Sequence, residues 1–206
     1  MQKDFKSMIQ KTIVYILFIF FSFQAKAQLT PLYQLNNEPS YTSLEKAKKD
    51  SATVTKLTLK RKKYKTIPKE IWNMTSLQYL DLSKNKIDSI PPQIENLKSL
   101  QVLILSKNKI SNLPEEFYKL TNLKIIRIGS TDVSSLSKQV SNFKKLEELD
   151  LWNTNVDVLP FELSKLPKLK LLDLRGILLN VEKQEDILEL YSETKVLMSL
   201  PCNCSF

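Results

Sequence analysis

Apolar residues recur along most of this chain at a fixed interval of 23 residues. The recurring stretches begin at Val54, Leu77, Leu100, Leu123, Leu146 and Leu169. Within each stretch the apolar residues first alternate with other residues, as Leu80 and Leu82 do, which is typical of a short strand with one buried face. One such strand cannot bury its face alone. The pattern therefore predicts stacked units whose strands pair in a single parallel sheet.

The second half of each unit returns the chain to the start of the next strand. Four units carry Ile-Pro or Leu-Pro there, with prolines at Pro68, Pro91, Pro114 and Pro160. Proline breaks a central strand but suits extended or short helical turns. The unit that begins at Leu123 has Ser137 in this place, so we expect its return path to differ.

The second unit reads LQYLDLSKNKIDSIPPQIENLKS from Leu77, and the third reads LQVLILSKNKISNLPEEFYKLTN from Leu100. Both fit the phrase LxxLxLxxNxLxxLPxxLxxLxx and resemble the leucine-rich repeat family, in its bacterial class with 23-residue repeats. The resemblance covers roughly residues 54–179. It implies an α/β solenoid of six repeats, with a parallel β-sheet on the concave side, short helical or extended turns on the convex side, and capping helices at both ends.

The ninth position of each repeat lies where the chain bends away from the strand. A side chain there can bind backbone groups that the turn leaves unpaired inside the solenoid. Asn85 and Asn108 fill this position as the family expects, and Thr131 and Thr154 offer one hydroxyl in partial replacement. We expect these residues to be structural.

The flanks of the repeats predict three further segments. Residues 1–27 are interpreted as a signal peptide, because lysines precede an apolar run at residues 13–23, and Ala25 and Ala27 supply the small residues that a signal peptidase requires. As a helix that run spans only about 16 Å, against about 30 Å for a membrane core, so we expect cleavage before Gln28 and no membrane span afterwards. Residues 28–53 are expected to form an N-terminal segment with a capping helix, and residues 180–206 a C-terminal cap.

Composition excludes several kinds of chemistry. The chain has no His and two Gly, so it can build neither a histidine-dependent catalytic site nor a glycine-rich phosphate loop, and we expect no cofactor. Cys202 and Cys204 are separated by one residue, which argues against a disulfide between them. They cannot complete a four-ligand zinc site without His. We expect one to be buried under the last repeat and the other to be free; an intermolecular disulfide, a lipid attachment or a metal are less favoured uses.

Carboxylates occupy the fifth position of three repeats, at Asp81, Asp150 and Asp173. The last two lie on neighbouring predicted strands, roughly 5 Å apart at Cα, and could imitate the two acids of a glycosidase. The sheet is open to water, however, and Arg127 can neutralise Asp150 by a cross-strand pair. The sequence therefore favours a protein without catalytic residues.

Charge is unevenly distributed along the chain. The formal net charge is +9, with basic residues concentrated at residues 46–65 and acidic residues at residues 182–193. A basic end can contact nucleic acid or an anionic surface. Because an exported protein seldom meets nucleic acid, we do not expect nucleic acid as a partner.

Side chains that point away from the predicted core form the concave surface. An exposed strand face is usually polar, yet apolar residues cluster near the middle of this one. The candidate partner-binding residues are Tyr79, Val102, Ile104, Ile125, Arg127 and Trp152. An apolar centre bordered by charges resembles a binding hot spot, although β-propensity alone also places apolar residues on strands. Gln101 is expected to face water, beside a buried Leu103.

These observations predict a secreted or periplasmic module that recognises a protein or peptide through its concave sheet. The sheet offers roughly 400 Å², against about 800 Å² on each side of a standard interface, so an extended peptide could bind there alone. The alternative is a glycan- or cell-envelope-binding module. In that case Trp152 and Tyr79 contact sugar rings, and the basic end contacts an anionic polymer.

Overall fold

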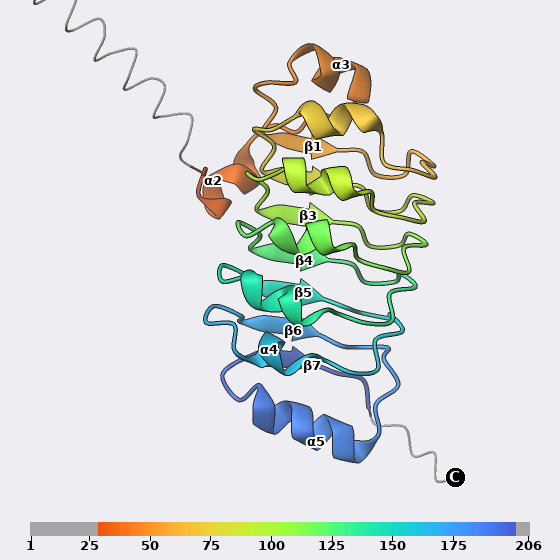
Figure 1. Ribbon diagram of the computed structural model, residues 1–206, viewed down its shortest axis with the longest axis vertical. Helices are drawn as coiled ribbons and strands as arrows, with labels where there is room; N and C mark the ends of the chain where they lie inside the picture. Colours follow the sequence, from red (N-terminus) through yellow and green to blue (C-terminus); the bar gives the residue numbers. More distant parts are fainter. Residues whose placement is uncertain (1–28, 201–206) are drawn as a thin grey trace, which may run out of the picture. The chain divides into compact units, whose positions relative to one another are not determined.

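The computed structural model describes residues 29–200 and contains one parallel sheet with strands in chain order (Figure 1). The strands are β1 (Lys56–Thr58), β2 (Tyr79–Asp81), β3 (Val102–Ile104), β4 (Ile125–Arg127), β5 (Glu148–Asp150), β6 (Leu171–Asp173) and β7 (Lys195–Leu197). Each pairing joins equivalent repeat positions, as Leu80 joins Leu103 and Leu103 joins Ile126. The predicted parallel α/β solenoid is confirmed. The predicted leader and both cysteines lie outside the described residues.

The sheet extends past the six predicted strands at both ends. The seventh strand, β7, pairs Lys195 with Leu171 of β6, so the C-terminal segment adds a further turn of solenoid. At the other end Tyr41 forms a parallel bridge with Leu57 of β1. Neither addition follows the leucine phrase, which is why the repeat pattern did not predict them.

Short helices carry the chain across the convex side. They are η1 (Lys69–Asn73), η2 (Pro92–Asn96), η3 (Glu115–Lys119), η4 (Lys138–Asn142) and α4 (Phe161–Ser164). A proline with extended backbone precedes four of them, and Ser137 precedes η4 with φ −73° and ψ 152°. The expectation that the return path differs in the repeat that begins at Leu123 is therefore wrong. Serine adopts the backbone of proline here, and its hydroxyl accepts a hydrogen bond from Gln139 N at 3.2 Å.

The core runs through the middle of the solenoid as one contiguous cluster. Strand leucines such as Leu80 and Leu103 are fully buried against convex residues such as Ile71 and Ile94. Aromatic residues replace the aliphatic pattern under η3 and η4, where the Tyr118 and Phe143 rings stack with centroids 5.7 Å apart. Packing of one repeat on the next therefore supplies the core that no repeat has alone.

Buried amides join neighbouring repeats at the ninth position. Asn108 Oδ1 accepts from Ile87 N at 3.0 Å, while its Nδ2 donates to Leu105 O at 2.7 Å and Leu82 O at 3.1 Å. Thr131 Oγ1 makes only the equivalent of one of these bonds, to Ile128 O at 2.7 Å. The predicted structural role of the asparagines, and the partial replacement by threonine, are both confirmed.

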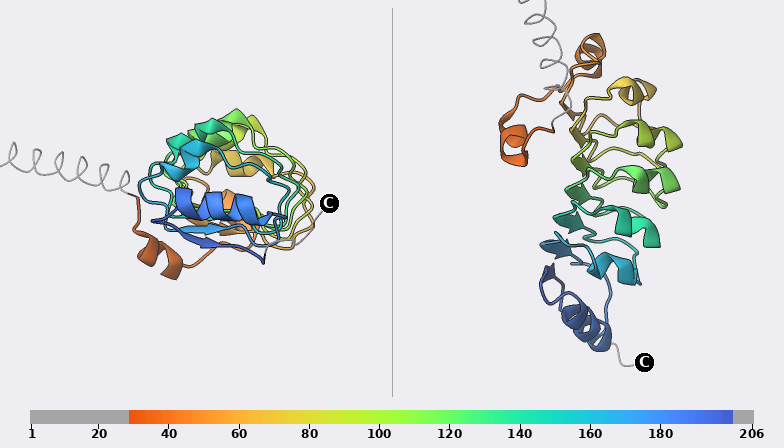
Figure 2. Two further views of the ribbon diagram at one scale, coloured as in Figure 1. Left: turned by 90° about the horizontal axis from the view of Figure 1, so that it is seen from below. Right: turned by 60° about the vertical axis from the view of Figure 1, so that its left-hand side comes forward.

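Helices flank the repeats at both ends. Helix α3 (Leu44–Lys49) precedes β1 and places Ala47 in the core, and α5 (Val181–Leu190) follows β6. Helix α5 begins after Asn180, whose side chain accepts from Lys183 N at 2.9 Å, yet none of its residues is buried. A further short helix, α2 (Leu32–Asn37), lies on the strand side of the solenoid, opposite to the convex helices (Figure 2). Within residues 29–200 no helix has the length and apolar character to cross a membrane.

Candidate binding surface

The predicted partner-binding residues lie on the concave sheet, in the register that the 23-residue interval requires. Tyr79, Val102 and Ile125 are direct neighbours in one column, and Ile104 and Arg127 are neighbours in the next. All except Val102 are at least partly exposed, and Trp152, two residues beyond β5, is 37% exposed. The sheet therefore brings these residues onto one face.

Val102 has to be removed from this set, because it is only 2% exposed and cannot offer area to a partner. It is shorter than Tyr79 and Ile125, which flank it in register on both sides. Gln101 corrects a second expectation, since it is fully buried and its Nε2 donates to Gln78 Oε1 at 2.7 Å. Gln101 does not face water, because its side chain is buried inside the solenoid just before β3 begins at Val102.

Helix α2 and the residues after it line the first part of the concave face. Lys56 Nζ on β1 donates to the carbonyl oxygens of Leu35 at 3.1 Å and Asn36 at 2.9 Å, at the end of α2. The same ammonium lies 5.0 Å from the centroid of the Tyr79 ring. Leu35 is fully buried but lies outside the main core. The open part of the concave face therefore begins beyond Tyr79 and extends over β3 to β6.

An ion pair crosses the centre of this open part. Arg127 donates from Nε to Glu148 Oε1 at 2.6 Å and from its terminal nitrogen to Glu148 Oε2 at 3.2 Å. The hydrogen bond to Glu148 is the main cause that raises the pKa of Arg127 above its ordinary value. The expected partner, Asp150, is thus replaced by Glu148, a residue of the neighbouring column.

The fifth-position carboxylates have a structural role at the ends of the strands. Asp81 accepts from Ser83 N at 2.8 Å, Asp150 from Trp152 N at 2.8 Å, and Asp173 from Arg175 N at 3.1 Å. Each caps the backbone two residues later in the same way. Repetition of one local bond in three repeats explains these carboxylates without catalysis.

Asp150 and Asp173 nevertheless differ in charge environment. Burial raises the pKa of Asp150, with a further contribution from Asp173. Burial also acts on Asp173, but its hydrogen bonds from Arg175, at 2.6 and 2.9 Å, outweigh it and lower the pKa of that carboxyl. A Cβ on Gly129 would lie 2.7 Å from Asp150 Oδ1, so only glycine leaves room for this carboxylate. Asp150 is the concave carboxylate whose charge a cationic ligand group would stabilise.

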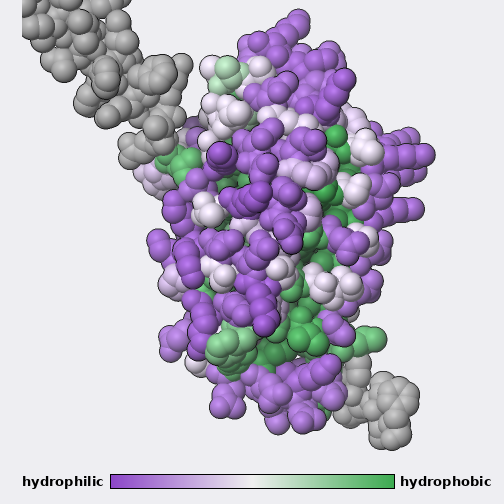
Figure 3. Space-filling view, in the orientation of Figure 1, coloured by the Kyte–Doolittle hydropathy of each residue, from purple (hydrophilic) through white to green (hydrophobic). Residues whose placement is uncertain are grey.

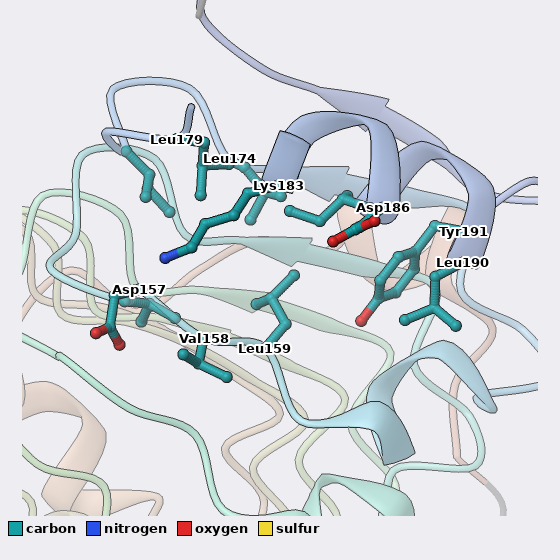
Figure 4. A pocket seen from close by; sticks show the side chains of 12 residues that line it. Asp157, Val158, Leu159, Leu174, Leu179, Lys183, Asp186, Leu190 and Tyr191 are labelled. Carbon is teal, nitrogen blue, oxygen red and sulfur yellow. The ribbon is translucent and has the colours of Figure 1, made fainter. Parts of the chain in front are cut away.

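A hollow lies away from the concave face, beneath the C-terminal helix α5 (Figure 4). It measures about 210 Å³ and is bordered by Leu159 and Leu174 of the last repeats and by Lys183, Leu190 and Tyr191 on the cap side. Burial raises the pKa of the Tyr191 phenol well above its ordinary range. The sequence did not predict this hollow, because the hollow depends on how loosely α5 packs against the last repeats. A hydrophobic area near the position of α5 is also visible on the surface (Figure 3). Val158, which borders the hollow, is exposed.

Within residues 29–200 no group of three or more His, Cys, Asp or Glu side chains is placed to hold a metal ion. A family model described as a leucine-rich repeat region matches residues 52–205. No curated protein sequence matches the chain at a significant level.

Three of the solved structures that are similar to this one come from Leptospira interrogans and Listeria monocytogenes. A leucine-rich repeat protein of Leptospira interrogans is 27% identical with a TM-score of 0.64, covering 80% of this chain and 47% of its own. Internalin C2 of Listeria monocytogenes is 27% identical with a TM-score of 0.64, covering 77% of this chain and 66% of its own. A further internalin of the same species, 20% identical with a TM-score of 0.58, shares the fold and is covered over 50% of its length. The chain thus spans about half to two thirds of these proteins.

Proposed function

Because the chain belongs to the leucine-rich repeat family, whose members of this kind are binding modules rather than enzymes, we propose that it is an exported module that recognises a protein or peptide through the open part of its concave sheet. Export rests on the predicted leader at residues 1–27. The observation that carries the recognition surface is the group of partly exposed apolar residues Ile104 and Ile125 beside the Arg127–Glu148 pair.

The area of this surface favours an extended ligand. From β3 to β6 there are three strand intervals of about 4.8 Å, and five residues along each strand add about 16 Å, which together give roughly 230 Å². A globular partner needs about 800 Å² on its side and would have to engage the turns as well. A peptide segment can lie on the open strands alone, with apolar side chains against Ile104 and Ile125 and a cationic group near Asp150.

Trp152 marks the end of this surface nearest to the turns. Its ring centroid is 5.4 Å from Lys107 Nζ, so a cation–π contact holds the indole, and the residue is 37% exposed. Aromatic side chains that are partly buried and held in place are frequent among residues that dominate binding energies. We expect Trp152 and the two isoleucines to contribute most to recognition.

Paired affinity capture tests this proposal. The native protein and the Ile104→Ser/Ile125→Ser variant serve as baits for envelope and extracellular proteins of the native organism, and captured proteins are identified by mass spectrometry. A true partner is retained by the native bait, is lost from the variant, and binds the purified native protein more tightly than the variant by about ten-fold or more. The matched control Ser134→Ala, on an exposed turn, should retain it. Equal capture by both baits would refute the concave surface.

A further inference from the structure

The turns that follow β1, β2 and β3 form a dense row of positive charge. Their sequences are KRKK, SKNK and SKNK, and they contribute eight cations: Lys60, Arg61, Lys62, Lys63, Lys84, Lys86, Lys107 and Lys109. We call these residues the basic ladder. No carboxylate occurs within these three turns. In the part of the chain that the structure describes, no ladder residue takes part in an ion pair.

The backbone stacks these turns directly on one another. Arg61 N donates to Ser83 O at 3.1 Å, Lys84 N to Ser106 O at 2.9 Å, and Lys107 N to Gly129 O at 2.9 Å. The sheet spacing of about 4.8 Å therefore continues through the turns, and the three cations stand in a line about 10 Å long. These turns form one edge of the solenoid, and its surface is hydrophilic (Figures 1 and 3).

The stacked charges repel one another. The pKa of Lys84 is lowered, first by Arg61 and then by Lys107, so the neighbouring cations are the main cause. A lone solvated lysine has no such neighbours. This repulsion is relieved by an anion with closely spaced charges, which the row would bind with release of counterions.

The backbone at the eighth position gives a second reason to assign a role to these charges. Arg61, Lys84 and Lys107 have φ of 59°, 57° and 61°, in the left-handed region that side chains of this type adopt at a cost. At the equivalent position the later repeats hold Ser130, with φ of 59°, then Asn153 and Gly176; the last two residues adopt this conformation more readily. The first three repeats thus carry a cation where the backbone alone favours asparagine or glycine.

The same edge changes character beyond the third repeat. A polar hollow of about 440 Å³ follows, bordered by Ser130, Asp132, Asn153, Asn155 and Asp157. Its carboxylates repel an anionic group, whereas hydroxyl, amide and carboxylate side chains together donate to and accept from neutral hydroxyl groups. Trp152 precedes Asn153 of this hollow in the chain, and its ring centroid lies 5.4 Å from Lys107 Nζ.

We propose that this edge binds an anionic polysaccharide, with the acidic groups of the polymer on the basic ladder and a neutral sugar ring in the polar hollow beside Trp152. An acidic peptide would use the ladder alone and would gain nothing from the hydroxyl and amide groups. This proposal makes the glycan-binding alternative specific. It assigns binding to the edge that carries the basic ladder, and it names an anionic polysaccharide as the ligand. The proposed site shares Trp152 with the end of the concave surface, but the basic ladder and the polar hollow contain neither Ile104 nor Ile125, so the ladder variants and the isoleucine variants test the two surfaces separately.

Dextran sulfate is the probe, with neutral dextran of the same length and poly-L-glutamate as comparison ligands in titration calorimetry. The test variant Lys84→Asn/Lys107→Asn removes two ladder charges and installs the residue that repeat five uses at this position. Its melting temperature should be unchanged or higher, because asparagine tolerates the left-handed backbone. Its affinity for dextran sulfate should fall about ten-fold, and log affinity should depend less steeply on log salt, because fewer counterions are released when two cationic contacts are removed.

The control Lys144→Asn/Lys168→Asn removes the same charge from two exposed lysines at the other ends of the repeats, and should change affinity less than two-fold. Asn155→Ala, in the hollow, should weaken dextran sulfate several-fold and leave poly-L-glutamate unchanged. Neutral dextran should bind much more weakly than the sulfated polymer. The proposal is overturned if the ladder and control variants lose affinity equally, or if dextran sulfate does not bind. It is also overturned if poly-L-glutamate binds as tightly as dextran sulfate and Asn155→Ala has no effect, because the edge is then a general polyanion surface.

Discussion

Replacement of Asn108 measures how strongly the buried amides join one repeat to the next. Its side chain makes three hydrogen bonds, with Ile87 N at 3.0 Å, Leu82 O at 3.1 Å and Leu105 O at 2.7 Å. Alanine removes all three in a site closed to water, and leaves three backbone groups without these partners. At about 1 kcal/mol for each bond, Asn108→Ala should lower the free energy of unfolding by about 3 kcal/mol.

Threonine at this position should give an intermediate result. Thr131 and Thr154 donate to the carbonyl three residues earlier at 2.7 and 2.8 Å, so Asn108→Thr should keep the bond to Leu105 O and lose the other two. The expected loss is about 2 kcal/mol. Asn112→Ala is the matched control, because this exposed amide donates only to Ser111 Oγ at 3.1 Å, and should change stability by less than about 0.5 kcal/mol.

Urea unfolding followed by circular dichroism gives these values, provided that the slope of stability against urea is the same for all variants. A changed slope would mean that the end repeats unfold separately. The reasoning fails if Asn108→Ala costs less than about 1 kcal/mol, or if threonine and alanine are equally destabilising. In either case packing, rather than the amide, would hold the turns together.

Further predictions concern burial, pH and export. Leu103→Ala should cost about 2 to 5 kcal/mol through lost burial and an unfilled cavity, and Gln101→Ala about 1 to 2 kcal/mol because its buried amide is hydrogen bonded; urea midpoints check both. Asp150, with its pKa raised in the folded state, contributes stability below its unfolded pKa of about 3.9 and loses it as the pH rises. Asp150→Asn should therefore be relatively stabilising at pH 7 and less so at pH 3. Asp173, with its pKa lowered, has the opposite sign, so Asp173→Asn should destabilise at pH 7 and become neutral in acid. N-terminal sequencing of the protein recovered from the native organism should begin at Gln28, and retention of the leader would contradict export.

The repeat interval was sufficient to predict the sheet, its register and the role of the ninth-position asparagines. These features depend on contacts between positions 23 residues apart, which the sequence displays directly. The same interval also aligns Arg61, Lys84 and Lys107, so the sequence contained the signal for the basic ladder. Order along the chain shows only a basic segment at residues 46–65, and the ladder becomes visible when the residues are aligned by repeat position.

The candidate site was less predictable, because the exposure of a concave side chain depends on the lengths of the neighbouring side chains and on segments outside the repeats. Val102 occupies an outward position but lies between larger neighbours. Helix α2 has only six residues, too few to show a helical period, so its place against β1 could not be derived from hydrophobic spacing. Strand β7 follows an acidic helix and lacks the leucine phrase, and only pairing with β6 identifies it.

Because each repeat stacks only on its neighbours, the stacking also determines how the molecule folds and unfolds. The bonds of Asn85 and Asn108 between repeats join residues 21 to 26 positions apart, and strand pairing has nearly the same reach, so nearly all loops that close during folding are of one short length. Structure can therefore nucleate at any adjacent pair and grow in both directions without a long-range search. Unfolding should proceed from the ends of the solenoid toward its middle. Helix α5, with no buried residue, should exchange its amide hydrogens first. Protection from exchange should increase inward and be greatest at β3 and β4.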